Sequence, residues 1–308
     1  MALLSQQPDR LFLITGATGT TGTTTVHLLL ERGHRVRAFV HREDDRSAAL
    51  AAAGAEIVVG DLLDLHAVSS AMRGVSGAYF VYPIAPALVD ATVVFAQAAT
   101  EAGVRSIVNM SQISARREAA SNAARQHWLC ERLLDRTAVL TAHLRPTFFA
   151  EWITWWWSLR DGEGVLRLPF GTGRHAPVAG VDQSYVIAAI LENPEPHDQQ
   201  VYPLHGPVEM DHDGIAAACS RALGIPVRYE PISIEEFAAA LACAGRSSHL
   251  IQHLSNVAID YRNGVFQGTN NLIEVIGNRT PSTVEDFVAE RRNLFERDGR
   301  LVVPASKH

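Results

Sequence analysis

The 308-residue sequence predicts an α/β fold, a doubly wound parallel sheet with a smaller C-terminal lobe. Three observations support this prediction. Apolar strands alternate with helices over the first half of the chain, which is the pattern of parallel βαβ units. Four of these helices stop at a glycine, a frequent C-terminal cap. A glycine-rich loop joins the first strand directly to the first helix.

The elements of the first half follow from continuous apolar runs, because a parallel strand is buried on both faces. Strands are expected at residues 11–15, 35–40, 55–61, 77–83, 105–111 and 138–146. Helices are expected between them at residues 23–32, 47–53, 65–73, 87–102 and 122–137. The sixth strand ends at Pro146, and the alternation stops there.

The second half has a different rhythm. The aromatic stretch "TFFAEWITWWWSL" is expected to be helical, and residues 164–182 have the composition of strands and turns. Further strands are expected at residues 199–207 and 227–233, and helices at 184–193, 214–224, 236–245 and 286–295. Candidate helix caps are Asp182, and the capping-box pairs Ser233 with Glu236 and Ser282 with Glu285.

Composition argues against several classes of protein. The net charge of −6 and the lack of a basic run disfavour nucleic-acid binding. No apolar run is long enough to cross a membrane and no signal peptide is evident, so a cytoplasmic protein is expected. The three cysteines are expected to be buried thiols. His249 and His253 are four residues apart without further ligands, so no metal site is expected.

The loop "ITGATGTTGTT" predicts a dinucleotide site. Glycines at this place form the tight turn, let the backbone approach a pyrophosphate and let the helix pack closely on the strand. The helix N-terminus offers free N–H groups and partial positive charge to the phosphates. The candidate cofactor-binding residues here are Gly16, Gly19 and Gly22, with Thr18, Thr20 and Thr21 as hydroxyl donors.

The spacing of this loop resembles that of the extended and atypical short-chain dehydrogenases. Four later stretches resemble the NmrA-like family of Rossmann proteins, namely "HRVRAFVHREDDRSAALAAAGAEIVVGDLLD", "EAGVRSIVNMSQISA", "TAHLRPTFFAEW" and "NGVFQGTNNLIEVIGNRTPSTVEDFVAE". The resemblance runs from Leu11 to Glu290. With the change of rhythm, it implies an NAD(P)-binding Rossmann domain over residues 1–146 and parts of 176–206. A closely packed substrate-binding lobe is expected over most of residues 147–308.

The end of the second predicted strand bears on the choice of dinucleotide. An acid there binds the 2′-hydroxyl of NAD, whereas an arginine accommodates the 2′-phosphate of NADP. This strand ends in His41 and Arg42, which favours NADP. The acids Glu43, Asp44 and Asp45 follow and leave NAD open, and the alternative for Arg42 is a solvated loop residue.

Other strand ends complete the predicted cofactor trough. The resemblance implies that Asp61 lies beside the adenine and Leu62 against its ring, although Asp61 is also a candidate cap of the next helix. Tyr82 and Pro83 end the fourth strand and are expected to line the ribose and nicotinamide side, unless Tyr82 is a packed loop aromatic. Pro146 is expected to contact the cofactor at the end of the sixth strand.

The fifth strand and the next helix carry the candidate catalytic residues. Short-chain dehydrogenases keep a serine and a Tyr-x-x-x-Lys pair here, but this chain has no such pair, and its one lysine is Lys307. Ser111, or else Ser114, stands in the place of the serine. The helix offers His127 and Glu131, and the resemblance to NmrA-like quinone reductases implies this His-x-x-x-Glu arrangement.

Histidine donates protons near neutral pH, and a carboxylate at i+4 is expected to raise its pKa and orient its ring. His127 is therefore expected to protonate or orient the acceptor, with Ser111 polarising an acceptor oxygen. The alternatives are a packed histidine, a structural turn serine, and a solvated Glu131 paired with Arg132 or Arg125.

The aromatic stretch after the sixth strand is a candidate roof of the substrate cleft. The resemblance places this segment over the cleft, and flat aromatic walls suit a planar or bulky apolar substrate. Core packing or a dimer surface is the alternative. On a helix, Phe148, Trp152, Trp155 and Trp156 would share one face. The candidate substrate-binding residues are Tyr82, Phe148, Phe149, Trp152 and Trp156.

The resemblance and these residues together predict an NADPH-dependent reductase that passes hydride to a quinone, enone, imine or similar planar acceptor. A non-catalytic NAD(P)-binding redox sensor with a protein partner is the alternative, because Tyr-x-x-x-Lys is missing. An isomerase of the epimerase or dehydratase type fits less well, since no acid/base pair is evident. The expected partner is a small-molecule substrate, without nucleic acid or membrane, and the expected assembly is a monomer or homodimer.

Overall fold

The structure is a computed structural model, and it describes residues 10–296. Residues 1–9 and 297–308, Lys307 among them, lie outside the described residues. The central sheet has seven strands in the order β3-β2-β1-β4-β5-β6-β9, and every neighbouring pair is parallel. This is the Rossmann strand order with one strand added at an edge, and it confirms the predicted fold class.

The six strands predicted before Pro146 are all present, and the seventh comes from later in the chain. They are β1 (Leu11–Thr15), β2 (Arg35–Val40), β3 (Glu56–Val59), β4 (Gly77–Phe80), β5 (Ser106–Met110), β6 (Leu140–Pro146) and β9 (Gln200–Leu204). The strands β1, β4 and β5 are buried along their whole length, as continuous apolar runs require. Because β4 ends at Phe80, Tyr82 and Pro83 lie in the loop after it.

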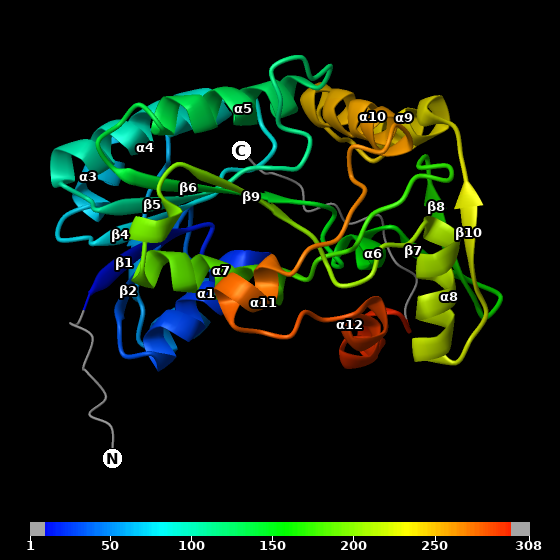
Figure 1. The fold of residues 1–308 in the computed structure, drawn as a ribbon. Helices are drawn as coiled ribbons and strands as arrows, with labels where there is room; N and C mark the ends of the chain where they lie inside the picture. The colour runs from blue at the N-terminus through cyan, green and yellow to red at the C-terminus, as the bar shows by residue number, and fades with distance from the viewer. Residues whose placement is uncertain (1–9, 297–308) are drawn as a thin grey trace.

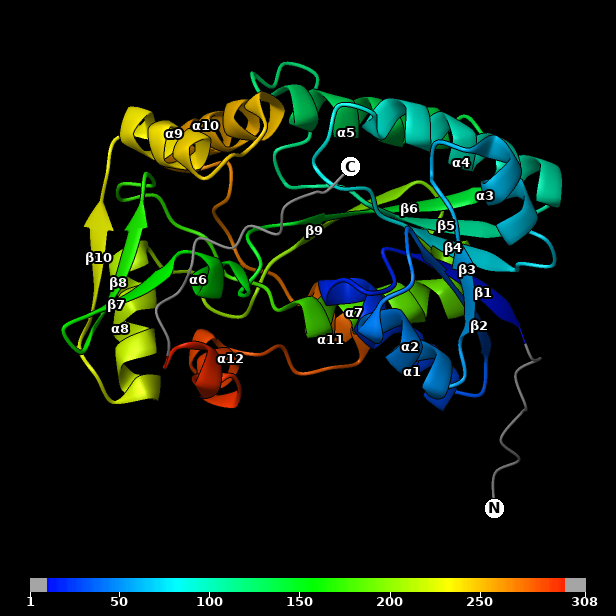
Figure 2. The same cartoon turned by 180° about the vertical axis from the view of Figure 1, so that it is seen from behind.

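Helices cover both faces of this sheet (Figures 1 and 2). One face carries α3 (Leu65–Ala71), α4 (Leu88–Ala102) and α5 (Asn122–Leu134). The other carries α1 (Thr20–Glu31), α2 (Asp45–Ala52), α7 (Gly180–Glu192) and α11 (Leu272–Gly277). Each helix layer encloses its own hydrophobic core against the sheet. The loops at the carboxyl ends of the strands are left to form the site.

The lobe lies beyond those carboxyl ends (Figure 1). Its own sheet has the order β10-β8-β7 and is built from β7 (Trp157–Arg160), β8 (Glu163–Leu168) and β10 (Val227–Pro231). The helices α8 (His212–Leu223) and α12 (Val284–Glu290) share a core with this sheet. The helices α9 (Ile234–Cys243) and α10 (Ser248–Arg262) form a pair that lies beside α5. The chain also has two single 3-10 turns, η1 (Glu195–His197) and η2 (Arg292–Leu294), among the described residues.

The helix predicted for the whole aromatic stretch is wrong. Only the single turn α6 (Trp152–Trp155) is helical, and Trp157 already begins β7. Trp156 packs against Phe237, whereas Trp157 packs against Phe295 in a different core. The helical turn has its C-terminal cap at Trp156 and the strand begins at Trp157, so these two consecutive tryptophans enter different cores.

Two predicted helix caps are displaced. Asp182 lies inside the first turn of α7 instead of capping it, and it is buried, where it accepts hydrogen bonds from Arg279 at 2.5 Å and from the Ser282 N–H at 2.8 Å. Because Ser282 donates a hydrogen bond to Asp182, the capping box of α12 forms one residue later, between Thr283 and Asp286.

Helix α9 matches its prediction in one respect and departs from it in another. Ser233 caps α9 through the Glu236 N–H, as expected. Cys243 at the end of α9 is exposed, so the expectation of three buried thiols holds only for Cys130 and Cys219. Over residues 10–296, no helix has the length and apolar character needed to cross a membrane.

Candidate active site

The glycine loop between β1 and α1 permits close approach by a ligand. Gly16 has a φ of +54°, and its carbonyl oxygen accepts the Gly19 N–H at 2.9 Å. A Cβ on Gly22 would lie 2.2 Å from the same carbonyl oxygen, so helix α1 packs directly on the loop. No side chain caps α1. The N–H groups of its first turn therefore point outward from the loop without a side-chain partner, as anion binding requires.

The three loop threonines have different surroundings. Thr21 is buried, and its hydroxyl is 2.8 Å from the hydroxyl of Tyr79, so this side chain belongs to the core and not to a phosphate site. Thr18 lines the trough described below, and Thr20 is exposed at the first position of α1. The structure thus leaves Thr18 and Thr20 as the hydroxyl donors near the loop.

A trough of about 450 Å³ starts at this loop and follows the carboxyl ends of four neighbouring strands. This is the edge at which open parallel sheets bind dinucleotides. The structure brings together predicted residues from loops that are far apart in the sequence. Those that line the trough are Gly16, Thr18, His41, Asp61, Leu62, Tyr82 and Pro83.

The second strand presents one of its two predicted cations to the trough. His41 lines the trough, whereas Arg42 is exposed and does not. Asp44 caps α2 through the Ser47 N–H and pairs with the Arg46 guanidinium at 2.6 Å, contacts that lower the pKa of Asp44. An acid engaged in this way is withdrawn from the ribose position, which removes one feature that favoured NAD.

Asp61 lines the trough and does not have the alternative capping role. The cap of α3 is Asp64, which accepts the His66 N–H at 2.8 Å. Asp61 instead accepts the Leu63 N–H at 2.9 Å, and this turn holds Leu62 against the trough. The loop after β3 is therefore shaped locally by its two acids.

A second cavity, of about 190 Å³, adjoins the trough, and we call it the acceptor cavity. Val81 and Tyr82 line both spaces. The acceptor cavity has the apolar and aromatic walls, with few polar groups, that are typical of small-molecule sites. The predicted residues that line it are Tyr82, Ser111, His127, Pro146, Phe148, Phe149 and Trp152.

Several residues that line the acceptor cavity were not expected from the sequence. His253 and Val257 come from α10, and Phe266 follows that helix and stacks on Phe148 with ring centroids 4.8 Å apart. The i,i+4 spacing of His253 and Val257 places both on one helix face, but local sequence does not show what that face covers. The other unexpected members are Ile84, Met110, Gln112, Ile113 and Thr147.

Trp156 lies behind the acceptor cavity. It is buried and lines a separate, much smaller cavity that also touches Trp152 and Phe148. The rings of Trp152 and Trp156 are 6.4 Å apart, so Trp156 supports the wall that Trp152 forms. The expectation that Trp156 contacts the substrate directly is therefore wrong.

Glu131 does not pair with His127. It is fully buried, and its carboxylate accepts hydrogen bonds from Arg145 at 2.8 and 2.5 Å and from the Ser111 hydroxyl at 2.5 Å. The bidentate guanidinium compensates the buried negative charge. The expected contact of Glu131 with His127 is therefore not made, because Arg145 from β6 binds the carboxylate instead. The alternative of a solvated Glu131 is wrong, although its predicted ion pair with Arg132 is present at 3.7 Å.

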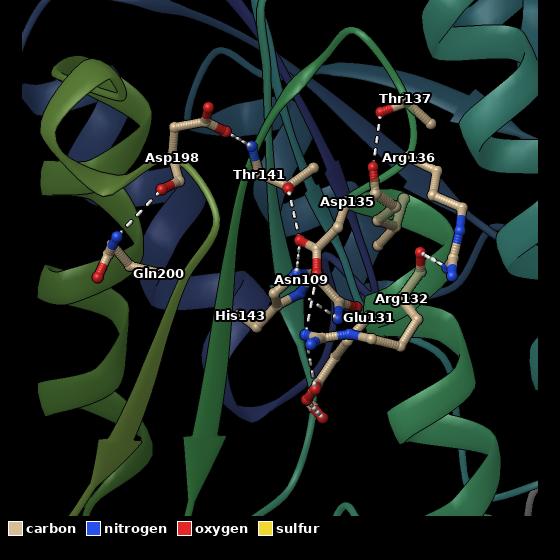
Figure 3. A network of polar contacts seen from close by, with 12 residues as sticks. Asn109, Glu131, Arg132, Asp135, Arg136, Thr137, Thr141, His143, Asp198 and Gln200 are labelled. Atoms are coloured by element: carbon tan, nitrogen blue, oxygen red, sulfur yellow. Dashed lines mark hydrogen bonds and ion pairs between the residues drawn. The ribbon is translucent and has the colours of Figure 1, made fainter. Parts of the chain in front are cut away.

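The polar network continues from Glu131 through Arg132 to Asp135 and joins α5 to the sheet (Figure 3). His143 on β6 is 2.8 Å from Asp135, which caps the end of α5, and 3.1 Å from the side chain of Asn109 on β5. These contacts fix the position of the helix that carries His127.

Ser111 lines the acceptor cavity, but its hydroxyl hydrogen points to Glu131. A hydroxyl has a single hydrogen to donate. Ser111 therefore presents only lone pairs to the cavity, and the expectation that it polarises an acceptor oxygen is wrong for this arrangement.

His127 is 4% exposed, and its Nε2 has no hydrogen-bond partner among residues 10–296. Burial lowers the pKa of His127 to about 4, against the charge of Glu131, which raises it, while the charge of Arg145 lowers it further. The imidazole is therefore neutral near pH 7, and the expected proton donor is instead an uncharged hydrogen-bonding group.

The chain matches the model of the NmrA-like family over residues 8–264. The NAD(P)H azoreductase of Xenophilus azovorans is 28% identical to it, over 92% of this chain and 99% of that protein. An NADPH-dependent quinone oxidoreductase from Escherichia coli, solved with NADPH, has a TM-score of 0.79 at 24% identity, covering 91% of this chain and 99% of its own. The negative transcriptional regulator NmrA, solved with NAD, has a TM-score of 0.80 at 15% identity, covering 92% and 96%. The family model spans more than half of the sequence, and the chain therefore belongs to the NmrA-like family.

Proposed function

We propose that this protein is an NADPH-dependent reductase of quinones, azo compounds or similar planar acceptors. The observation that carries the proposal is the acceptor cavity, which adjoins the dinucleotide trough and shares Val81 and Tyr82 with it. A protein that only senses its cofactor does not need an apolar cavity at the reacting end of the trough. The similarity to an azoreductase over nearly its whole length supports the same conclusion.

The residues of the trough fit a dinucleotide. Gly16 and Gly22 keep the loop free of side chains where a pyrophosphate approaches, and the first turn of α1 supplies N–H groups. Asp61 and Leu62 would hold the adenine side and Tyr82 and Pro83 the nicotinamide side. His41 at the ribose position, where NAD-binding proteins carry an acid, favours NADPH over NADH.

NADPH supplies a hydride, and reduction of a quinone with one further proton gives a hydroquinone and NADP⁺. The chain's own contribution is to hold the acceptor flat between aromatic walls and to exclude water from it. Neutral His127 orients the acceptor heteroatom by a hydrogen bond, and the hydroquinone anion takes its proton from solvent when it leaves the cavity. Glu131 and Arg145 act as positioning residues, because they fix Ser111 and helix α5.

The sensor hypothesis has one observation in its favour, the similarity in fold to a regulator that binds NAD. A titration and a turnover assay separate the two functions. We expect NADPH to bind more tightly than NADH, and NADPH absorbance to fall when 1,2-naphthoquinone is added. His127→Ala is expected to lower kcat/KM by about tenfold, the effect of one hydrogen bond, while NADPH binding is retained. Tight NADPH binding without turnover on quinones or azo dyes would favour the sensor.

A further inference from the structure

The acceptor cavity has no formally charged wall. None of the described residues that line it is an aspartate, glutamate, lysine or arginine. The nearest ion pair, Glu131 with Arg145, is internally compensated and reaches the cavity only through the Ser111 hydroxyl. An ionic group on a substrate would therefore find no counter-charge in this cavity.

The polar part of the wall contains two imidazoles from different helices. His127 comes from α5, and His253 comes from α10, where it is 4% exposed. The Ser121 hydroxyl accepts the Ala124 N–H at 3.1 Å and lies 2.8 Å from Nδ1 of His253. With that hydroxyl hydrogen directed to Nδ1, His253 carries its own hydrogen on Nε2.

Both imidazoles are uncharged near neutral pH. Burial first, and then the charges of His127 and His249, lower the pKa of His253 to about 3. Nε2 of His127 is buried and has no hydrogen-bond partner among the described residues. Nε2 of His253 forms no hydrogen bond to a described residue either. A buried polar nitrogen without a partner is costly, so Nε2 of His127 gains from a ligand heteroatom, whereas Nε2 of His253 is not fully buried and is open to a ligand.

Resting on the proposed function, we infer that the acceptor cavity selects uncharged planar acceptors and that His127 and His253 together hold the acceptor's heteroatoms. The aromatic walls of Phe148, Phe149 and Trp152 contact the flat faces of such a molecule. A sulfonate or carboxylate on the ring system would be buried without a cation, which is far more costly than burying a neutral ring. His253 is thus a substrate-contacting residue that the resemblance did not assign.

Matched pairs of acceptors test the selection directly. 1,2-Naphthoquinone is compared with its 4-sulfonate, and 1-phenylazo-2-naphthol with the dye sulfonated on the phenyl ring. We expect kcat/KM to be at least about tenfold higher for the neutral member of each pair, since an unpaired buried charge costs more than one lost hydrogen bond. The sulfonate makes the quinone a stronger oxidant, so intrinsic reactivity works against this result. Equal or higher kcat/KM for the sulfonated members would overturn the inference.

A variant at the rim of the cavity tests the cause of the selection. Ile84 is half-buried and lines the cavity, so Ile84→Arg introduces a cation that can reach solvent. Ile84→Met is the matched control, because it is long and uncharged. We expect Ile84→Arg to lower the ratio of kcat/KM for the neutral acceptor to kcat/KM for the sulfonated acceptor by about tenfold. Ile84→Met is expected to leave this ratio unchanged. An equal fall of this ratio in both variants would contradict a role for charge.

The role of His253 has its own control on the same helix. His249 lies one turn earlier and does not line the cavity. We expect His253→Ala to raise KM for neutral acceptors about tenfold and His253→Gln, which keeps an N–H donor, to recover part of the loss. His249→Ala is expected to behave as the parent protein does. Unchanged KM in His253→Ala, with NADPH binding intact, would refute the assignment.

A binding measurement separates this inference from the proposed function. With NADPH present, whose nicotinamide ring is uncharged, 2-naphthol and 2-naphthol-6-sulfonate are titrated by calorimetry, and neither can be reduced. We expect 2-naphthol to bind at least about tenfold more tightly. That result without turnover on any acceptor would support the selective cavity and contradict the reductase proposal. Tighter binding of the sulfonate would contradict the selective cavity even if acceptors are reduced.

Discussion

Glu131 and His127 lie one turn apart on α5, and their side chains have different partners. Glu131 is bound by Arg145 and Ser111 inside the molecule, while His127 faces the acceptor cavity. The i,i+4 spacing alone suggested a coupled pair, because two such residues share a helix face. The Arg145 guanidinium from β6 binds the carboxylate of Glu131 instead. Burial then keeps His127 uncharged near pH 7.

The depressed pKa of His127 predicts an unusual pH profile. Its neutral form predominates above about pH 4, so kcat/KM should stay level from pH 8 to about pH 5.5 and fall only as the imidazole becomes protonated at lower pH. The ionisable groups around it are Glu131, Arg145 and, on α10, His253. Steady-state assays across this range would check the profile. A step in kcat/KM centred near pH 6.5, absent in His127→Ala, would show that the histidine titrates normally.

Removal of one member of the buried ion pair should be costly. Glu131→Gln leaves the guanidinium of Arg145 without its counter-charge, and we expect the free energy of unfolding to fall by about 3 kcal/mol. The double variant Glu131→Leu with Arg145→Met removes both charges and should lose less. Urea denaturation would measure both. If the single and double variants lose the same amount, the pair does not compensate charge in the way described.

At the scale of the elements, the site depends on how loops leave the strands. The loop after β1 contributes Gly16, and the loops after β2, β3 and β4 contribute His41, Asp61 and Tyr82. Parallel strands place all these loops at one edge, which is why residues distant in sequence line one trough. The helix α1 packs on the glycine loop at Gly22 and holds the trough at its narrow end.

Gly22→Ala tests that packing. A Cβ there would lie 2.2 Å from the Gly16 carbonyl oxygen, so the loop or the helix must move. We expect the affinity for NADPH to fall by at least about tenfold, because the phosphate-binding N–H groups shift with the loop. Gly33→Ala is a useful control, since its positive φ strains the backbone while a Cβ there meets nothing within 4 Å. Similar losses of affinity in both variants would mean that strain, and not the close approach, is responsible.

The sequence predicted the parts of the fold and site that depend on local patterns. The six strands before Pro146, the glycine loop and the strand-end residues of the trough all follow from apolar runs and turn chemistry. The aromatic stretch failed because a helix and an extended chain both accommodate consecutive tryptophans, and only the two cores decide between them. His253 was missed because nothing on α10 itself reveals which helix it packs against.

At the scale of the whole molecule, the lobe and the Rossmann sheet enclose the acceptor cavity from two sides. The sheet side contributes the loop after β5 and helix α5, and the lobe contributes α10 and the aromatic turn. Arg116 on the loop before α5 binds Asp260 on α10 at 2.6 and 2.8 Å, and Ser121 binds His253. These contacts join α10 of the lobe to α5 and the loop before it, and so hold the two sides of the acceptor cavity together.

An anaerobic single-turnover measurement tests most directly whether hydride passes from bound NADPH to an acceptor in the acceptor cavity. The protein with one equivalent of bound NADPH is mixed with excess 1,2-naphthoquinone, and NADP⁺ and hydroquinone are quantified. We predict one equivalent of each product, and a slower reaction when the nicotinamide C4 hydrogens are replaced by deuterium. NADPH that stays bound and unoxidised while the quinone is present would contradict the reductase function.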